Sequence, residues 1–306
     1  MVNEQQTTTI HEYLDAAPQR LDLYVASLYQ GYSRSFIARL IKQGAIKING
    51  IVIEKPGYTV TAGDCIEFTL PAVVPLVGKP VSHDHGVTVL YEHEDFIIVQ
   101  KPAGLLVHPP HGYCQEVTLV DCLISLFPAL QTVGKLDRPG IVHRLDKDTS
   151  GIMVIPLNNY SLTIFGDKFK NRQMNKQYMA LVHGEPPQSM MVDKPIGRDP
   201  LCRVRMAAGS HTIEPRTALT HCTTIAYQEG WATVLCHPVT GRTHQIRVHL
   251  ASMGYPLLGD DLYGGNKERI ARQALHAHKL SFDYGGQQFA FVAPLPEDMM
   301  TLVGHC

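Results

Sequence analysis

Residues 140–156, GIVHRLDKDTSGIMVIP, decide how the rest of the chain is interpreted. An apolar start, a charged middle and a second apolar run predict two strand-like segments joined by a polar loop. The loop places a carboxylate, Asp146, among cations that would keep it ionised. Loops held by a rigid scaffold often carry catalytic side chains. The same residues would equally suit a solvated hairpin tip, so the local pattern leaves both interpretations open.

A second informative segment is TGRTHQIRVHLASMG at residues 240–254. Its spacing predicts a helix that starts near Thr243, ends at Gly254 and turns an apolar face containing Ile246 to the core. Arg247 borders that face, and an arginine there usually has a carboxylate partner because burying it unpaired is costly. Asp146 is a candidate for this partner. The alternative is an arginine that extends over the helix surface with its charge in water.

A third segment, KQYMAL at residues 176–181, has the alternation of a strand. Lys176 and Tyr178 then share one face. A tyrosine beside a lysine suits stacking on a base while the lysine contacts phosphate, although a core or edge tyrosine is the ordinary alternative.

The order of elements predicts an α+β fold. Short strands mix with separate helices, without the regular strand–helix alternation of a parallel sheet, so we expect a mainly antiparallel sheet. Two helical patterns and an Asn49-Gly50 hairpin signal precede a proline- and glycine-rich stretch. The expected divisions are a tail at 1–18, a small domain at 19–72, a linker at 73–86 and a larger domain at 87–306.

Composition excludes several classes of protein. The 306 residues contain no apolar run of the roughly 18 residues that a membrane span needs, and the N-terminus lacks a signal-peptide pattern. We therefore expect a cytoplasmic protein. Seven scattered cysteines without a CxxC pair suggest reduced thiols. The sixteen histidines lack the spacing of a zinc site, so no metal is expected.

The charge distribution says more than the net charge of −1, which by itself counts against a nucleic-acid-binding protein. Residues 19–55 carry six basic and two acidic side chains, and residues 167–176 carry four and one. A nearly neutral chain can thus present basic faces to phosphates, or these faces are simply solvated. In the first region the candidate RNA-binding residues are Arg34, Arg39 and Lys42.

Together these segments resemble the RluA-type family of pseudouridine synthases. The resemblance rests on HRLDKDTSG at 143–151, KQYMALVHG at 176–184 and GRTHQIRVHLASMGYPLLGDDLYG at 241–264, in that order. It extends over roughly residues 87–300, although Gln100 stands where an asparagine is usual, which puts a turn contact in doubt. Residues 19–70 similarly resemble an S-four-type RNA-binding domain.

The resemblance implies a role for each candidate residue. Asp146 would be the catalytic carboxylate and Arg247 its partner, while Tyr178 would stack on the uracil and assist proton removal. Uridine isomerisation involves no redox change, so it implies no cofactor and no metal. The implied substrate contacts come from Arg144, which would fill the space of a flipped nucleotide, and from His143, Lys176 and the apolar wall of Ile246.

The predicted function is therefore an RNA pseudouridine synthase that acts as a monomer on large-subunit ribosomal RNA or a pre-ribosomal particle, with transfer RNA as the alternative substrate. Two other classes stay open. Asp146, Asp148 and Gly259-Asp260-Asp261 could belong to a phosphotransferase of the haloacid dehalogenase type, although His143 and Arg144 stand where that family needs a buried strand. The pocket could also be a vestige in a non-catalytic RNA-binding or ribosome-assembly factor. Turnover in EDTA would separate the phosphotransferase, which needs magnesium, from the isomerase.

Overall fold

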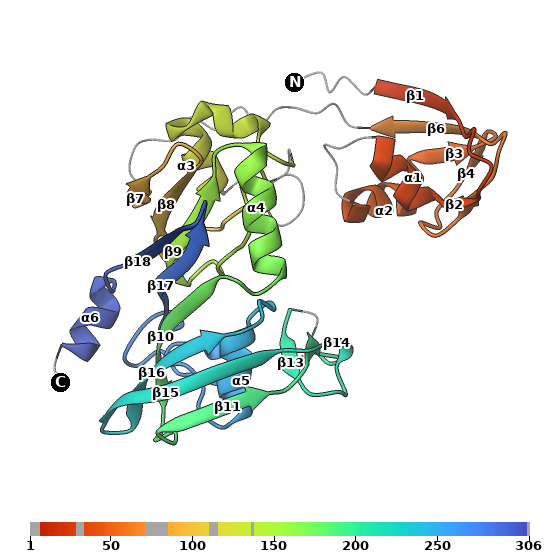
Figure 1. The fold of residues 1–306 in the computed structure, drawn as a ribbon. Helices are drawn as coiled ribbons and strands as arrows, with labels where there is room; N and C mark the ends of the chain where they lie inside the picture. Colours follow the sequence, from red (N-terminus) through yellow and green to blue (C-terminus); the bar gives the residue numbers. More distant parts are fainter. Residues whose placement is uncertain are drawn as a thin grey trace.

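The computed structural model describes residues 7–28, 34–70, 85–109, 116–135, 138–202 and 204–304. It confirms the predicted α+β class: a small N-terminal unit with small antiparallel sheets precedes a larger unit built on a nine-stranded sheet (Figure 1). Most of the predicted linker, at 71–84, lies outside the described residues. No helix within these ranges is long and apolar enough to cross a membrane.

The N-terminal unit has a hydrophobic core of its own, whose buried members lie between Tyr13 and Phe68. The Asn49-Gly50 signal forms the expected hairpin, with both residues at the positive φ of 52° and 80° that such a turn needs. The elements are β1 (Thr7–Glu12), β2 (Gln19–Arg20), α1 (Leu21–Leu28), α2 (Arg34–Lys42), β3 (Ile46–Ile48), β4 (Ile51–Val52), β5 (Thr59–Val60) and β6 (Cys65–Leu70).

The predicted tail is wrong for residues 7–12, which form the edge strand β1. This strand pairs antiparallel with β6 along its whole length, from Thr7 opposite Leu70 to Glu12 opposite Cys65. The segment TTTIHE lacks alternating apolar residues, and its one aliphatic side chain, Ile10, is 65% exposed. Backbone pairing rather than burial therefore holds the strand, which explains why hydrophobic periodicity does not reveal it.

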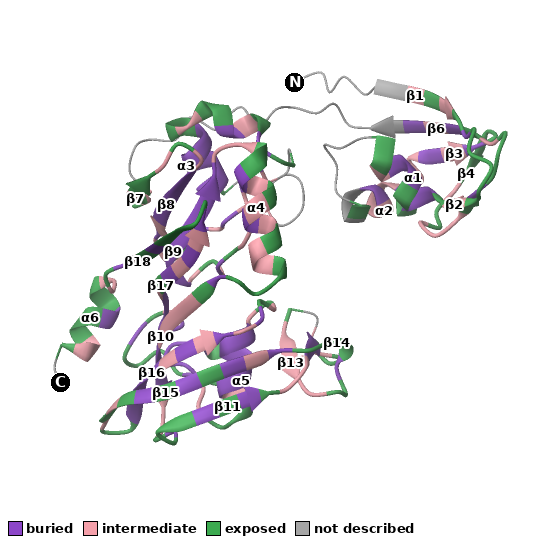
Figure 2. Ribbon diagram, viewed as in Figure 1, coloured by how far each residue is buried: buried purple, intermediate pink, exposed green. Residues whose placement is uncertain are grey.

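The large sheet has the strand order β11-β15-β16-β10-β17-β9-β8-β7, and β18 also pairs with β17. Figure 2 shows buried residues along β8 and β9. Most of these residues belong to the larger hydrophobic core. The strands of this sheet are β7 (Thr88–Glu92), β8 (Phe96–Lys101), β9 (Ser150–Pro156), β10 (Asn175–His183), β11 (Ser189–Asp193), β15 (Leu219–Gln228), β16 (Trp231–Pro238), β17 (Leu275–Tyr284) and β18 (Gln287–Val292).

All described pairs in this sheet are antiparallel except the contact between β9 and β17. That contact is short: Ser150 lies opposite His276 and Gly151 opposite Ala277. A Cβ on Gly151 would lie 2.4 Å from the Ala277 carbonyl oxygen, so only glycine permits this approach. The two antiparallel halves of the sheet are thus joined at the point where the 143–151 loop ends.

The remaining elements pack on the faces of the sheet or extend from its edge (Figure 1). Side chains of α3 and α4 belong to the same hydrophobic core as β8 and β9. Ile246 and Leu250 of α5 belong to a second core. These elements are α3 (Leu119–Leu126), η1 (Pro128–Thr132), α4 (Asn159–Lys170), β12 (Ile196–Arg198), β13 (Met206–Ala208), β14 (Ile213–Arg216), α5 (Gln245–Ser252), η2 (Asp261–Tyr263) and α6 (Glu297–Val303).

One local expectation is corrected. The predicted strand before the charged loop is absent from the described residues 140–149: Ile141 and Val142 pack against the core as irregular chain, without a paired strand. Between α3 and η1 the helical run is divided at Pro128, which fixes its own φ and donates no backbone hydrogen bond. Gln100, at the position that departs from the family pattern, donates to the Pro294 carbonyl at 3.4 Å.

Candidate active site

A pocket of about 680 Å³ opens where the charged loop, the end of β16 and the start of α5 meet. Among the described residues that line it, Asp146 is the single carboxylate. The other lining residues include seven arginines and lysines. The pocket is therefore suited to bind a polyanion, with Asp146 as the one acidic group among its described residues. These basic residues are Arg138, Arg144, Lys170, Arg172, Lys176, Arg242 and Arg247.

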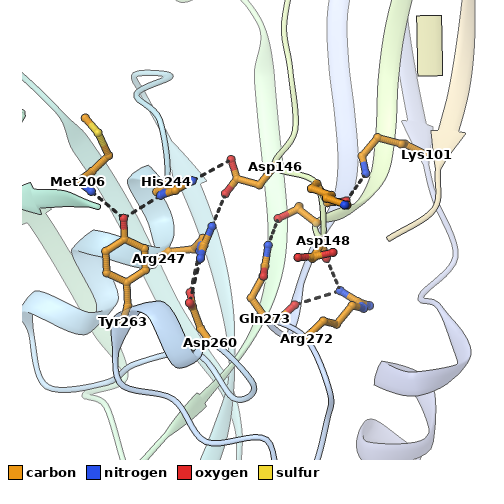
Figure 3. Close-up of polar contacts among 12 residues, drawn as sticks. Lys101, Asp146, Asp148, Met206, His244, Arg247, Asp260, Tyr263, Arg272 and Gln273 are labelled. Carbon is orange, nitrogen blue, oxygen red and sulfur yellow. Dashed lines mark hydrogen bonds and ion pairs between the residues drawn. The ribbon is translucent and has the colours of Figure 1, made fainter. Parts of the chain in front are cut away.

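Arg247 bridges two carboxylates inside the site (Figure 3). Its Nη1 lies 3.1 Å from Oδ2 of Asp146, while Nε and Nη2 donate to Asp260 at 2.7 and 2.9 Å. Burial alone would lower the pKa of Arg247, but the hydrogen bonds and charge of Asp260, joined by those of Asp146, raise it well above its usual value. The predicted pairing of Arg247 with Asp146 is present in the structure. Asp260, a second partner, was not predicted.

Lys101 holds the backbone of the charged loop through hydrogen bonds to carbonyl oxygens. Its Nζ is fully buried and donates to the carbonyl oxygens of Pro102, Leu105 and Lys147 at 2.7, 2.8 and 2.8 Å. Burial lowers the pKa of Lys101 to about 7, against the opposing charge of nearby carboxylates. Three carbonyls match the three hydrogens of an ammonium, so the contact is complete only when Lys101 is protonated.

The next two loop residues, Asp148 and Thr149, are held from the segment directly before β17 (Figure 3). Arg272 donates from Nη1 to the Asp148 carbonyl at 3.1 Å and binds Asp298 of α6 through Nε and Nη2. Gln273 donates to Oγ1 of Thr149 at 3.4 Å. The loop is therefore preorganised, and its Asp146 side chain, which is 20% exposed, faces the pocket.

Tyr178 and Ile246 lie where the sequence predicts them, on the pocket wall. Ile246 is 5% exposed and provides an apolar surface. Burial, with a smaller contribution from the charge of Asp146, raises the pKa of the Tyr178 hydroxyl, so it stays protonated at neutral pH. Lys176 also lines the pocket; its Nζ donates to the Thr240 carbonyl at 3.3 Å, and burial lowers its pKa to about 8.

His143 and Arg144, which precede Leu145 and Asp146 in the loop, lie in different environments. Arg144 is exposed and lines the pocket, so it is free to move toward a ligand. His143 also lines the pocket but packs its ring on Phe169, 4.5 Å between centroids, and accepts a hydrogen bond from the Val154 backbone at 3.1 Å. Burial and the charge of Lys176 lower the pKa of His143 to about 3. His143 therefore supports the loop as a neutral ring.

The three basic candidates of the N-terminal unit, Arg34, Arg39 and Lys42, lie on α2 and do not line this pocket. Arg34 donates to Asp22 at 2.9 Å while remaining half exposed. Lys42 is exposed. These residues therefore form a separate basic surface.

Six contributors to the site escaped prediction: Lys101, His244, Asp260, Tyr263, Arg272 and Gln273. The sequence offers a signal for Asp260, because a buried arginine needs more than one acceptor. No group of three metal-ligating side chains occurs within the described residues, and Asp260 is already bound to Arg247.

Comparisons with known proteins identify the family of both units of the chain. The sequence model described as RNA pseudouridylate synthase matches residues 95–252, and the one described as S4 domain matches residues 19–66. An uncharacterized RNA pseudouridine synthase of Bacillus subtilis is 36% identical over 291 residues, 93% of each chain. The ribosomal large subunit pseudouridine synthase D of Zymomonas mobilis is 35% identical over 295 residues, 92% of each chain.

A solved structure has the same catalytic fold. Human RNA pseudouridylate synthase domain containing 1 superposes with a TM-score of 0.59 at 28% identity, over 71% of this chain and 86% of that one. At 71% of this chain, the superposed part is large enough to contain the nine-stranded sheet on which the pocket is built.

Proposed function

Since the chain belongs to the RNA pseudouridylate synthase family of the RluA type, and is thus an RNA-modifying isomerase, we propose that it converts specific uridines of large-subunit ribosomal RNA with Asp146 as its catalytic carboxylate. The observation that carries the role of Asp146 is its position as the single carboxylate among the described residues of a basic pocket. Family membership argues against the phosphotransferase alternative, and the presence of Asp146, Tyr178 and Arg247 together in the pocket argues against a vestigial site.

The reaction conserves the composition of the nucleotide. The bond between N1 of uracil and C1′ of ribose breaks, the base turns, and a bond forms between C5 and C1′. The hydrogen on C5 leaves and N1 gains one. A carboxylate near the sugar can attack C1′ or remove a proton from the ribose, and in both routes Arg247 would hold it in place through the contact at 3.1 Å.

The walls of the pocket suit a uracil that has left its stack. Tyr178 offers a ring for stacking and a protonated hydroxyl, and Ile246 an apolar surface opposite charged groups. Extruding a base costs about a few kcal/mol. Exposed Arg144 at the pocket mouth can occupy the vacated position in the helix, and the basic rim can bind the flanking phosphates, which offsets that cost.

Ribosomal RNA is the substrate that the relatives favour. Synthases from Zymomonas mobilis and Vibrio cholerae, each 35% identical to this chain, are named for the large ribosomal subunit. The S-four domain with its basic helix α2 provides a second RNA-binding surface, suited to a large folded RNA.

The deciding experiment compares Asp146→Asn with Asp148→Asn. Both changes remove one charge from the same loop, but Asp148 is not among the described residues that line the pocket. The assay is release of tritium from C5-labelled ribosomal RNA with EDTA present. We expect no release from Asp146→Asn and substantial release from Asp148→Asn.

Undiminished release from Asp146→Asn would refute the role of Asp146, and equal loss in both variants would point to a site that needs two carboxylates. Mapping pseudouridines in total RNA with and without the protein tests the substrate. New sites in transfer RNA alone would refute the ribosomal assignment.

A further inference from the structure

His244, directly before α5, adopts an unfavourable backbone conformation. Its φ and ψ of 55° and 21° lie in the left-handed region, where the Cβ of a non-glycine residue crowds the backbone. Such a conformation persists where the surroundings over-determine it, and this often happens beside a functional site. The His244 side chain lines the pocket, so its contacts show what the conformation achieves.

A chain of polar contacts runs through His244 (Figure 3). The Met206 backbone N–H donates to the Tyr263 hydroxyl at 3.0 Å, that hydroxyl lies 2.8 Å from Nδ1 of His244, and Nε2 lies 4.0 Å from Oδ1 of Asp146. A backbone N–H can only donate, so the Tyr263 oxygen accepts this bond and its own hydrogen is available for Nδ1, 2.8 Å away. When that hydrogen is donated to Nδ1, a neutral ring carries its hydrogen on Nε2, and this is the tautomer we assign.

The imidazole is neutral in this setting. Burial lowers the pKa of His244, and the positive charges of Arg247 and Arg144 act in the same direction. The carboxylates of Asp146 and Asp260 oppose this without reversing it. A neutral ring with its hydrogen on Nε2 presents a fixed N–H dipole to Asp146 without neutralising its charge.

We propose that His244 is a positioning residue that orients the Asp146 carboxylate through its Nε2–H, with the tautomer set by Tyr263 and the Met206 backbone. Arg247 binds Oδ2 and His244 faces Oδ1, so the two oxygens have different partners. At 4.0 Å the second contact is longer than a hydrogen bond. It shortens when RNA closes the pocket, as catalytic contacts commonly do. This inference rests on the proposed role of Asp146.

The first test reads the tautomer directly and needs no activity. In protein labelled with 15N-histidine, two-bond 15N–1H correlations separate Nδ1–H, Nε2–H and cationic rings, and the signal lost in His244→Gln belongs to His244. We expect a neutral Nε2–H ring at pH 7. A cationic ring or an Nδ1–H ring would overturn the proposal whatever the fate of Asp146 in catalysis.

The second test replaces His244 by asparagine or by glutamine, whose side-chain amides lie at different distances from the backbone. Asparagine tolerates the left-handed backbone better than glutamine does, but its amide reaches only the place of Nδ1. Glutamine brings an N–H to the place of Nε2. We expect His244→Gln to retain kcat within about threefold and His244→Asn to lose about tenfold to hundredfold, the value of one hydrogen bond to a charged group.

KM for RNA should stay near the wild-type value in both variants, because the contact acts on Asp146 and not on phosphates. A better rate in His244→Asn than in His244→Gln would overturn the proposal and indicate that the residue serves only the backbone turn.

The third test asks whether Tyr263 acts through His244. Tyr263→Phe keeps the ring that lies 5.0 Å from the Arg247 guanidinium but removes the hydroxyl. We expect a lower kcat and a mixed tautomer in the NMR signal, with no further loss when Tyr263→Phe is added to His244→Asn. Losses that multiply would contradict the link. If Asp146→Asn proves fully active while the tautomer result holds, the function proposed for Asp146 fails and the hydrogen-bond chain stands.

Discussion

Asp260 binds Arg247 through two hydrogen bonds, Oδ2 to Nε at 2.7 Å and Oδ1 to Nη2 at 2.9 Å, with both side chains under 10% exposed. This pair orients the guanidinium so that Nη1 is left for Asp146. Asp260→Asn should lower both kcat and stability, the latter by about 3–5 kcal/mol, because it breaks a buried pair and leaves Arg247 undercompensated. Urea unfolding measures the loss.

The neighbouring residue is a matched control. Asp261 forms an exposed pair with Lys267 at 2.7 Å, and water screens the attraction between its charges. We expect Asp261→Asn to resemble the wild type in unfolding and turnover. Equal destabilisation by the two changes would mean that Asp260 has no special function in orienting Arg247.

Tyr178→Phe separates stacking from proton transfer. The ring remains, so RNA affinity should stay within about twofold, while product formation should slow at least about a hundredfold, the usual contribution of a general acid–base group. Because the raised pKa keeps the Tyr178 hydroxyl protonated, the wild-type rate should show no inflection from this residue between pH 6 and 9. Filter binding and single-turnover rates test both points, and full turnover in the variant would leave Tyr178 a stacking surface only.

His143 should make the fold sensitive to acid. Its folded pKa of about 3 lies below the roughly 6.5 of an unfolded histidine, so between these values the unfolded chain binds a proton that the folded chain does not. Stability is therefore complete above about pH 6.5 and falls as the pH falls through this window. At pH 4.5 the loss from His143 should be about 2–3 kcal/mol.

The measurement compares urea unfolding of wild type and His143→Gln at pH 7.5 and 4.5. Glutamine can still accept from Val154 but does not titrate, so the difference between the two pH values should shrink in the variant. His211→Gln, at an exposed position, should leave the difference unchanged. An unaltered difference in His143→Gln would show that the acid sensitivity arises elsewhere.

Removal of the N-terminal unit should weaken RNA binding without abolishing chemistry. Its core is built from residues of its own, and the pocket takes no described lining residue from it. A chain beginning at residue 85 should isomerise short substrates, and its affinity should depend less on salt, because each lost phosphate contact reduces the slope by about 0.7–0.9. In the full chain, Lys42→Gln should remove about one such contact. A folded but inactive truncated chain would contradict this division of roles.

The sequence predicted those parts of the molecule that obey a period or a compact motif. The helix α5, the strands β9 and β10 and the Asn49-Gly50 hairpin follow from apolar spacing and turn chemistry. Asp146 and Arg247 stood out because an arginine beside a buried helix face needs a carboxylate. Ile10 and its neighbours in β1 gave no such signal, since that strand is held mainly by its backbone pairing with β6.

The contacts that complete the site were beyond this reasoning. Lys101 and Arg272 donate hydrogen bonds to backbone carbonyls of the loop. Every residue has such a carbonyl, so the sequence does not indicate which one is bound. Tyr263 reaches His244 across nineteen residues, through a hydroxyl whose partners depend on the final packing. Such contacts appear only when segments distant in sequence lie side by side.

The short parallel contact between β9 and β17 has a consequence for how the enzyme comes into being. It joins residues 126 apart, and Ser150 Oγ lies 2.9 Å from the His276 ring where they meet. On the ribosome, β8 and β9 are made and can pair long before β17 emerges, yet Arg272, Gln273 and His276 are needed to hold the end of the charged loop. Closing so long a segment is slow. A nascent chain can therefore fold both halves of its sheet in turn while staying unable to act on RNA until nearly all of it has been synthesised.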